Sequence, residues 1–218
     1  GAHSFLQAGR IVARRAAIAG VVGAVLIGLA APAGAQAVAP EAAKQFLTVL
    51  GNRTIDAMKG AASEHNAQFT SIMLDNLDFD ALATFSLGKL ARSVTPADKR
   101  EFTVLFAAYV IDVAIEKFGN LQIKSFGLGS VTQQPNGDAK VFSRIAAGDK
   151  PLEVHWRVHN AGGKPRVNDI EVDGYSLAIH YRGEFERAGL STVPGLIARL
   201  KELTKASKTL PTVHTAMK

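Results

Sequence analysis

The sequence predicts an α+β fold in which helices pack on one face of a curved, four-stranded antiparallel sheet. Apolar residues recur at helical spacing up to residue 118 and again after residue 176. Between these regions lie four segments with strand character, separated by short turn sequences. No repeat or internal linker interrupts this pattern, so we expect a single domain over residues 38–208.

The first 37 residues have the pattern of a secretory signal peptide. Three arginines at positions 10–15 precede an uncharged run over residues 16–31, and the small-residue site Ala-Gln-Ala follows at 35–37. We expect cleavage after Ala37 and a mature chain that starts at Val38. The alternative is an uncleaved membrane anchor, although the run is shorter than the ~20 apolar residues that span a bilayer comfortably.

Three helices are expected before residue 95. Pro40 suits the first turn of the first helix, and Gly60 ends it. A second helix begins near Glu64, and a third begins near Asp78 or Asp80, either of which would serve as its cap. The apolar face of the first helix is formed by Phe46, Leu47, Leu50, Thr54, Ala57 and Met58.

The clearest helix begins at Thr95 and ends at Gly119. Thr95 is the predicted N-cap, Pro96 occupies the first turn, and Asp98 takes the acidic third position of a capping box. Apolar residues occupy two sides of this helix. It is therefore expected either to be central in the domain or to face a cavity with one side.

The four strands are predicted at residues 121–132, 139–147, 151–159 and 165–173. In the third of them Leu152, Val154, Trp156 and Val158 alternate with Glu153, His155, Arg157 and His159. Such alternation is typical of a sheet with one dry face and one wet face. Two helices are expected afterwards, from about Ser176 to Ala188 and from Thr192 to Ala206, and residues 209–218 are predicted to be a flexible tail.

Composition and motifs exclude several classes of chemistry. The absence of cysteine removes disulfides, thiolate metal sites and a Cys nucleophile. His155 and His159 lie roughly 13 Å apart along a strand, too far to share one metal ion. Residues 75–80 lack the Gly and Glu of a calcium loop. The Gly127–Gly129 segment opens no helix and therefore predicts a bulge or bend instead of a phosphate cradle.

The charged residues favour neither an acidic catalytic pair nor a nucleic-acid surface. Asp169 and Glu171 are close enough in sequence to pair as carboxylates, but a rim position with Lys or Arg partners is the ordinary case. The net charge of +6 is not gathered into a basic helix or stripe, so we expect no nucleic-acid partner. No metal and no cofactor is expected.

The inward-facing apolar residues allow two interpretations. One is a solid core; the other is an apolar pocket enclosed between the sheet and the helices over 96–118 and 176–188. Periodicity does not separate them, because a filled core and a lined cavity place apolar residues at the same spacing. We predict the pocket. Its candidate ligand-binding residues are Phe106, Tyr109, Val110, Val113, Val154, Trp156, Val158, Tyr175, Tyr181 and Phe185.

Several motifs together resemble the MlaC family, also called the toluene-tolerance auxiliary family. They occur in the family's order and spacing and span most of residues 40–206. The motifs are LGKLARSVTPADKREFTVLFAAY at 87–109, HWR at 155–157, NDIEVDGYS at 168–176, YRGEF at 181–185 and PGLIARL at 194–200.

This resemblance implies a periplasmic carrier that binds lipid tails between a curved sheet and helices. It also implies two membrane partners that exchange lipid with the carrier, an inner-membrane lipid transporter and an outer-membrane complex. The overall likeness favours the hopanoid-associated branch, HpnM, over the phospholipid carriers. The family's more common Gly-Val-Ser is replaced by Gly174-Tyr175-Ser176, so Tyr175 is expected to narrow or polarise the pocket.

Two other functions remain open from the residues alone. An isomerase-like or dehydratase-like enzyme on a cone-shaped α+β fold would need an inward carboxylate or histidine with a shifted pKa. The predicted inward positions carry Leu, Val, Trp and Phe instead, and we therefore expect a binding protein without catalysis. A scaffold protein with a solid core would have no cavity.

Overall fold

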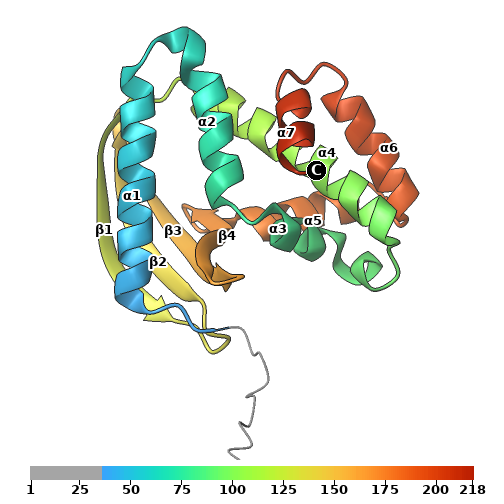
Figure 1. The fold of residues 1–218 in the computed structure, drawn as a ribbon, viewed down its shortest axis with the longest axis horizontal. Coiled ribbons are helices and arrows are strands. Elements are labelled where there is room, and N and C mark those ends of the chain that lie inside the picture. The colour runs from blue at the N-terminus through green and yellow to red at the C-terminus, as the bar shows by residue number, and fades with distance from the viewer. Residues whose placement is uncertain (1–35) are drawn as a thin grey trace, which may run out of the picture. The chain divides into compact units, whose positions relative to one another are not determined.

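The computed structural model of the chain describes residues 36–218, in which helices cover one face of an antiparallel sheet (Figure 1). The predicted signal peptide thus lies, apart from its last two residues, outside the described part. The helical elements are α1 (Pro40–Lys59), α2 (Ala62–Asn76), α3 (Phe79–Leu87), a 3-10 turn η1 (Gly88–Arg92), α4 (Pro96–Phe118), α5 (Leu177–Arg187), α6 (Val193–Thr204) and α7 (Leu210–Ala216). Within residues 36–218 none of these helices is long and apolar enough to cross a membrane.

The sheet has five strands in sequence order, and every neighbouring pair is antiparallel. They are β1 (Ile123–Gln133), β2 (Ala139–Ala147), β3 (Lys150–Ala161), β4 (Lys164–Val172) and β5 (Tyr175–Ser176). The predicted α+β fold with four long strands is confirmed. The fifth strand is too short for side-chain alternation to reveal, and its pairing with β4 places the start of α5 against the sheet.

Side-chain caps begin four of the described helices, α3, α4, α5 and α6, at or near the predicted starts. The Thr95 hydroxyl accepts a hydrogen bond from the Asp98 N–H at 3.1 Å, and the Ser176 hydroxyl accepts one from the Ile179 N–H at 3.2 Å. At α3 the cap is Asp78, not Asp80, since the Asp78 carboxylate accepts from the Ala81 N–H at 3.0 Å. These bonds satisfy N–H groups that have no partner within the helix.

The pairing of β1 with β2 is irregular near Gly129. The two strands change register between Leu128 and Val131, beside the Gly127–Gly129 segment for which a bulge or bend is predicted. A Cβ on Gly129 would approach the Phe142 ring to 2.7 Å, so the missing side chain lets that ring lie across the strand.

The packed core lies where α4 meets α5, α6 and α7. Phe102 and Phe106 of α4 are fully buried and stack with their ring centroids 5.6 Å apart. From α5, Tyr181 and Phe185 meet Phe106 edge-on, with centroids 5.4 and 6.2 Å away. Edge-on and offset-stacked rings are the favoured arrangements for aromatic groups in a core.

Residues 209–218 differ from the flexible tail that we expected. Residues 210–216 form α7, and Val213 is fully buried against the core. Leu210 and Met217 pack on the same core from either end of the helix. The segment is too short to show clear periodicity, and its order depends on the apolar surface that α4 offers it.

The junction between α2 and α3 is fastened to the strands. The Arg166 guanidinium of β4 donates to the carbonyls of Leu74 and Leu77 at 3.0 and 2.6 Å, where α2 ends. A ring nitrogen of His159 lies 2.8 Å from the Asp78 carboxylate that caps α3. These contacts give His159 a structural role and hold α2 in place over the sheet.

Candidate functional site

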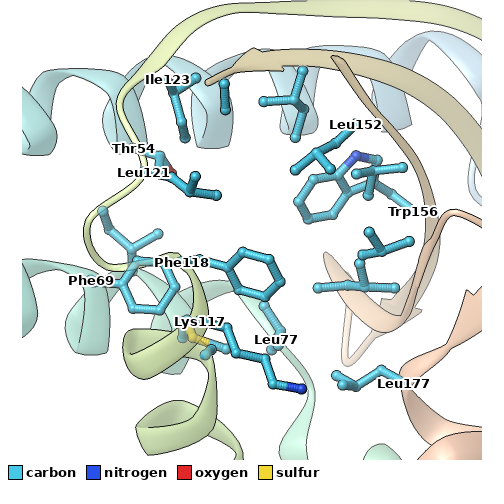
Figure 2. Close-up of a pocket in the computed structure, with 18 of the residues that line it drawn as sticks. Thr54, Phe69, Leu77, Lys117, Phe118, Leu121, Ile123, Leu152, Trp156 and Leu177 are labelled. Carbon is cyan, nitrogen blue, oxygen red and sulfur yellow. The ribbon is translucent and has the colours of Figure 1, made fainter. Parts of the chain in front are cut away.

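An apolar cavity of about 570 Å³ lies between the sheet and the helices α1, α2, α4 and α5. Its size falls within the ~300–1,000 Å³ of small-molecule pockets and exceeds ordinary packing voids. Figure 2 shows side chains from several elements converging on this open space. The lining residues are Leu50, Gly51, Thr54, Ile55, Met58, Phe69, Ile72, Met73, Leu77, Val110, Val113, Ala114, Lys117, Phe118, Leu121, Ile123, Phe126, Ile145, Ala147, Leu152, Val154, Trp156, Ile170, Val172, Tyr175, Ser176, Leu177, His180 and Tyr181.

The sheet contributes a wall of apolar side chains in register. Phe126, Ile145 and Leu152 face one another across β1, β2 and β3, because Phe126 pairs with Ile145 and Ile145 with Leu152. Trp156 pairs with Ile170 across β3 and β4. Alternate residues of a strand point to the same face of the sheet. Because the apolar residues of neighbouring strands are paired in register, they lie side by side and form one continuous wall.

The α4 helix contributes a second wall from its C-terminal half. Val110, Val113, Ala114, Lys117 and Phe118 recur at the spacing of one helical face, and all of them line the cavity. The N-terminal part of the same helix is buried in the packed core. In this part of the helix one side, with Val110 and Val113, lines the cavity, while Ile111 on another side is buried in the core.

The α1 and α2 helices contribute a further part of the cavity lining. Five residues of α1 line it, from Leu50 to Met58, together with Phe69, Ile72 and Met73 of α2. Gly51 is buried where α1 approaches β1, and a Cβ at this position would lie 2.3 Å from the Phe126 ring. The missing side chain thus allows the Phe126 ring to pack directly against α1 in the cavity wall.

The Trp156 indole in the wall is hydrogen-bonded within the protein. The Trp156 indole N–H donates to the Ser143 hydroxyl at 2.8 Å, and that hydroxyl donates to the Val154 carbonyl at 3.0 Å. Burial raises the pKa of Tyr181, with smaller contributions from Tyr109 and Glu184, so the hydroxyl stays protonated. Within the described chain no carboxylate lines the cavity, and no cluster of potential metal ligands occurs.

The two carboxylates considered from the sequence serve structural roles. Asp169 accepts hydrogen bonds from the Ser176 hydroxyl at 2.6 Å and the Ala178 N–H at 3.1 Å, which fixes the start of α5. Glu171 forms an ion pair with Lys140 at 3.2 Å. Neither lines the cavity, so this pair supplies no acid–base chemistry there.

Six of the ten predicted binding residues line the cavity. They are Val110, Val113, Val154, Trp156, Tyr175 and Tyr181. The other four, Phe106, Tyr109, Val158 and Phe185, lie outside its lining; Phe106, Val158 and Phe185 are buried in the core, and Tyr109 packs edge-on against Tyr181. The predicted and observed lining differ for a simple reason. Side chains on one apolar face of an element pack against other side chains at one end of the element and border the cavity at the other end.

Sequence reasoning missed the contribution of α1 and α2 to this lining. It identified the apolar face that carries Leu50, Thr54 and Met58, and this face does border the cavity. Nothing in that periodicity distinguishes a helix over a pocket from a helix over packed side chains. It also missed Lys117 and Phe118, since the last turn of a helix ordinarily faces solvent.

Comparison with known proteins places this geometry in a family. Residues 41–202 match the family model described as MlaC protein. No protein of curated function matches the chain significantly. Among solved structures, the fold is similar to that of the phospholipid-binding protein from Ralstonia solanacearum, determined in complex with a phospholipid. The TM-score is 0.60 at 18% identity, and the match covers 76% of this chain and 94% of that chain.

Proposed function

Because the chain belongs to the MlaC family, we propose that it is a lipid-binding protein that carries single lipid molecules between membranes. The observation that carries this proposal is the apolar cavity of about 570 Å³ between the sheet and the helices. Moving a lipid tail from water into such a space is favourable by ~0.8 kcal/mol per methylene group. Binding of this kind needs no catalytic group.

The residues that we propose to contact the lipid tails are the apolar ones of the two facing walls. Val110 and Val113 contribute from α4, and Val154 and Trp156 contribute from β3. Tyr181 closes the wall at α5 with a buried, protonated hydroxyl. Tyr175 is 79% exposed and lies at the edge, so it shapes the entrance more than the interior.

We also propose that the protein acts in the periplasm after cleavage of residues 1–37. The basic, apolar and small-residue segments of that region support export. The Val38 N–H donates to the Gly137 carbonyl at 3.0 Å and the Val38 side chain is buried, so the folded domain is anchored from this residue onward. The proposed partners are an inner-membrane lipid transporter and an outer-membrane complex.

Lipid analysis tests the proposal directly. The chain is expressed with residues 1–37 in two Gram-negative hosts, one that makes hopanoids and one that does not, and purified from the periplasm without detergent. Native mass spectrometry is expected to show a protein that begins at Val38 with one lipid bound. Extraction then identifies the lipid as phospholipid or hopanoid.

Two results would contradict the proposal. Protein that carries no lipid, and that binds no fluorescent lipid after purification, would leave the cavity without its proposed ligand. Full-length protein retained in the membrane fraction would contradict export and release. An enzyme acting on an apolar substrate would instead be revealed by chemically altered lipid in the extract, relative to the lipids of the host.

A further inference from the structure

The mouth of the cavity is defined by residues that both line it and are exposed to solvent. In the described chain these are Lys117 and Phe118 at the end of α4, and Tyr175 and His180 beside the start of α5. They come from two short segments, the end of α4 and residues 175–180. Figure 2 shows Lys117 at the edge of the cavity, with its side chain running from α4 toward Leu177.

Lys117 brings a positive charge to this mouth. Its side chain lines the cavity, while the residue as a whole is exposed. This arrangement lets the apolar stem cover apolar surface while the ammonium stays in water. Within residues 36–218 the ammonium takes part in none of the ion pairs.

Two carboxylates near the start of α5, those of Asp169 and Glu184, already have partners. Asp169 accepts from the Ser176 hydroxyl and the Ala178 N–H. Glu184 accepts from the Arg187 guanidinium, and that bond lowers the pKa of the Glu184 carboxyl. Neither residue lines the cavity. A ligand at the mouth therefore meets the ammonium of Lys117, which forms no ion pair in the described chain, together with polar groups of Tyr175 and His180.

We propose that Lys117 selects lipids with an anionic headgroup, a phosphate for example, and that Tyr175 and His180 donate to the same group. The inference rests on the proposed function, because lipid tails in the cavity leave the polar headgroup at the mouth, where it keeps its contact with water. A Lys ammonium binds phosphate as a compact point charge with three donors. Lys117 is then the residue that determines headgroup specificity.

Two fluorescent lipids with identical acyl chains test this assignment. One is phosphatidylglycerol, with an anionic phosphate, and the other is diacylglycerol, which has none. Their affinities are measured on the delipidated mature protein as wild type, Lys117→Gln and Lys117→Glu. Lys208→Glu is the matched control, because Lys208 is exposed, lies between α6 and α7, and does not line the cavity.

The wild type is expected to bind phosphatidylglycerol more tightly than diacylglycerol. Lys117→Gln should weaken binding of phosphatidylglycerol about twofold to fivefold, the range of an exposed charge pair, and Lys117→Glu should weaken it further. Affinity for diacylglycerol should stay unchanged in both variants. The Lys208→Glu protein should bind both lipids like the wild type.

Several outcomes would overturn the assignment. Unchanged phosphatidylglycerol binding by Lys117→Glu would mean that the charge plays no part. An equal loss for diacylglycerol would mean that Lys117 acts by packing. If the wild type bound neither lipid, the proposed function would fail and this inference with it. Binding of both lipids with no effect at Lys117 would leave the proposed function standing and remove only the headgroup site.

Inorganic phosphate distinguishes a lipid headgroup from a free anion. Millimolar phosphate is expected to displace phosphatidylglycerol no more than chloride does at the same ionic strength, since the tails supply most of the binding free energy. Displacement beyond that of chloride, lost in Lys117→Gln, would mean that the mouth binds free phosphate, and the assignment to a lipid headgroup would fall.

Discussion

At the scale of single residues, Gly51 shapes the cavity by lacking a side chain. It lies inside α1, where glycine is less favourable than alanine by ~1 kcal/mol. A Cβ here would lie 2.3 Å from the Phe126 ring, and that ring is itself part of the cavity wall. The intrinsic penalty of glycine in the helix is therefore offset by close contact between α1 and β1.

Gly51→Ala is expected to weaken lipid binding and to destabilise the protein slightly. The new methyl group displaces the Phe126 ring into the cavity; overpacking of this kind costs ~1–3 kcal/mol, against a gain of ~1 kcal/mol in helix propensity. Urea unfolding and binding of a fluorescent lipid measure the two effects. Asn52→Ala, at an exposed position of the same helix, is the control for helix propensity.

A second substitution tests the mechanism. Adding Phe126→Leu to Gly51→Ala removes the ring that the methyl group displaces, so lipid binding should recover in part. Unchanged binding in Gly51→Ala alone would show that the ring moves away from the cavity instead.

At the scale of elements, α4 belongs both to the packed core and to the cavity wall, with different sides of its C-terminal half. Ile111 is fully buried and does not line the cavity, whereas Val113, two residues later, does. The same size increase should therefore have different effects at these two positions.

Val113→Trp is expected to reduce lipid binding strongly while leaving the stability of the delipidated protein nearly unchanged or higher, because the indole fills empty space. Ile111→Trp should instead overpack the core and cost ~1–3 kcal/mol. Melting temperature and fluorescent-lipid uptake, measured on delipidated protein, separate the two. Steep destabilisation by Val113→Trp with normal lipid uptake would assign this face to the core.

The α7 helix is the other element whose role is testable. Ending the chain after Lys208 removes Val213, Leu210 and Met217 from the core. Since full burial of one large apolar side chain is worth ~1.5–3 kcal/mol, we expect a loss of at least about 3 kcal/mol in the free energy of unfolding. Urea unfolding measures this loss, and Thr212→Ala, an exposed position of the same helix, should unfold like the wild type. An unchanged midpoint in the truncated chain would mean that α7 contributes nothing to stability.

At the scale of the whole molecule, the cavity ties stability to its ligand. Side chains that line an empty apolar space lack contacts on one side, and a bound lipid supplies them. Removal of the lipid is therefore expected to lower the melting temperature, and added lipid should raise it again in a concentration-dependent way. At a free lipid concentration of a hundred times Kd, the free energy of unfolding should increase by ~2.7 kcal/mol. The Val113→Trp protein, with its cavity filled, should show a smaller shift. Equal melting curves with and without lipid would contradict this coupling.

The sequence by itself determined the class of fold, the long elements and the family. The Thr95 cap, the glycine turns between the strands and the alternation of β3 are local signals, and the structure confirms each of them. The family resemblance, which rests on motifs spread over the chain, is confirmed by the match over residues 41–202. Local signals suffice here because caps, turns and faces depend on neighbours within a few residues.

Only the tertiary structure decided which apolar residues border empty space. Phe106 and Val113 are both apolar residues of α4, yet Phe106 is packed among aromatic rings and Val113 faces the cavity. In the same way, α7 is ordered and Lys117 stands at the mouth because of segments far away in sequence. Periodicity reports that a face is apolar. The distance between this face and the element opposite it depends on how segments that are remote in sequence pack together. No local sequence pattern encodes that distance.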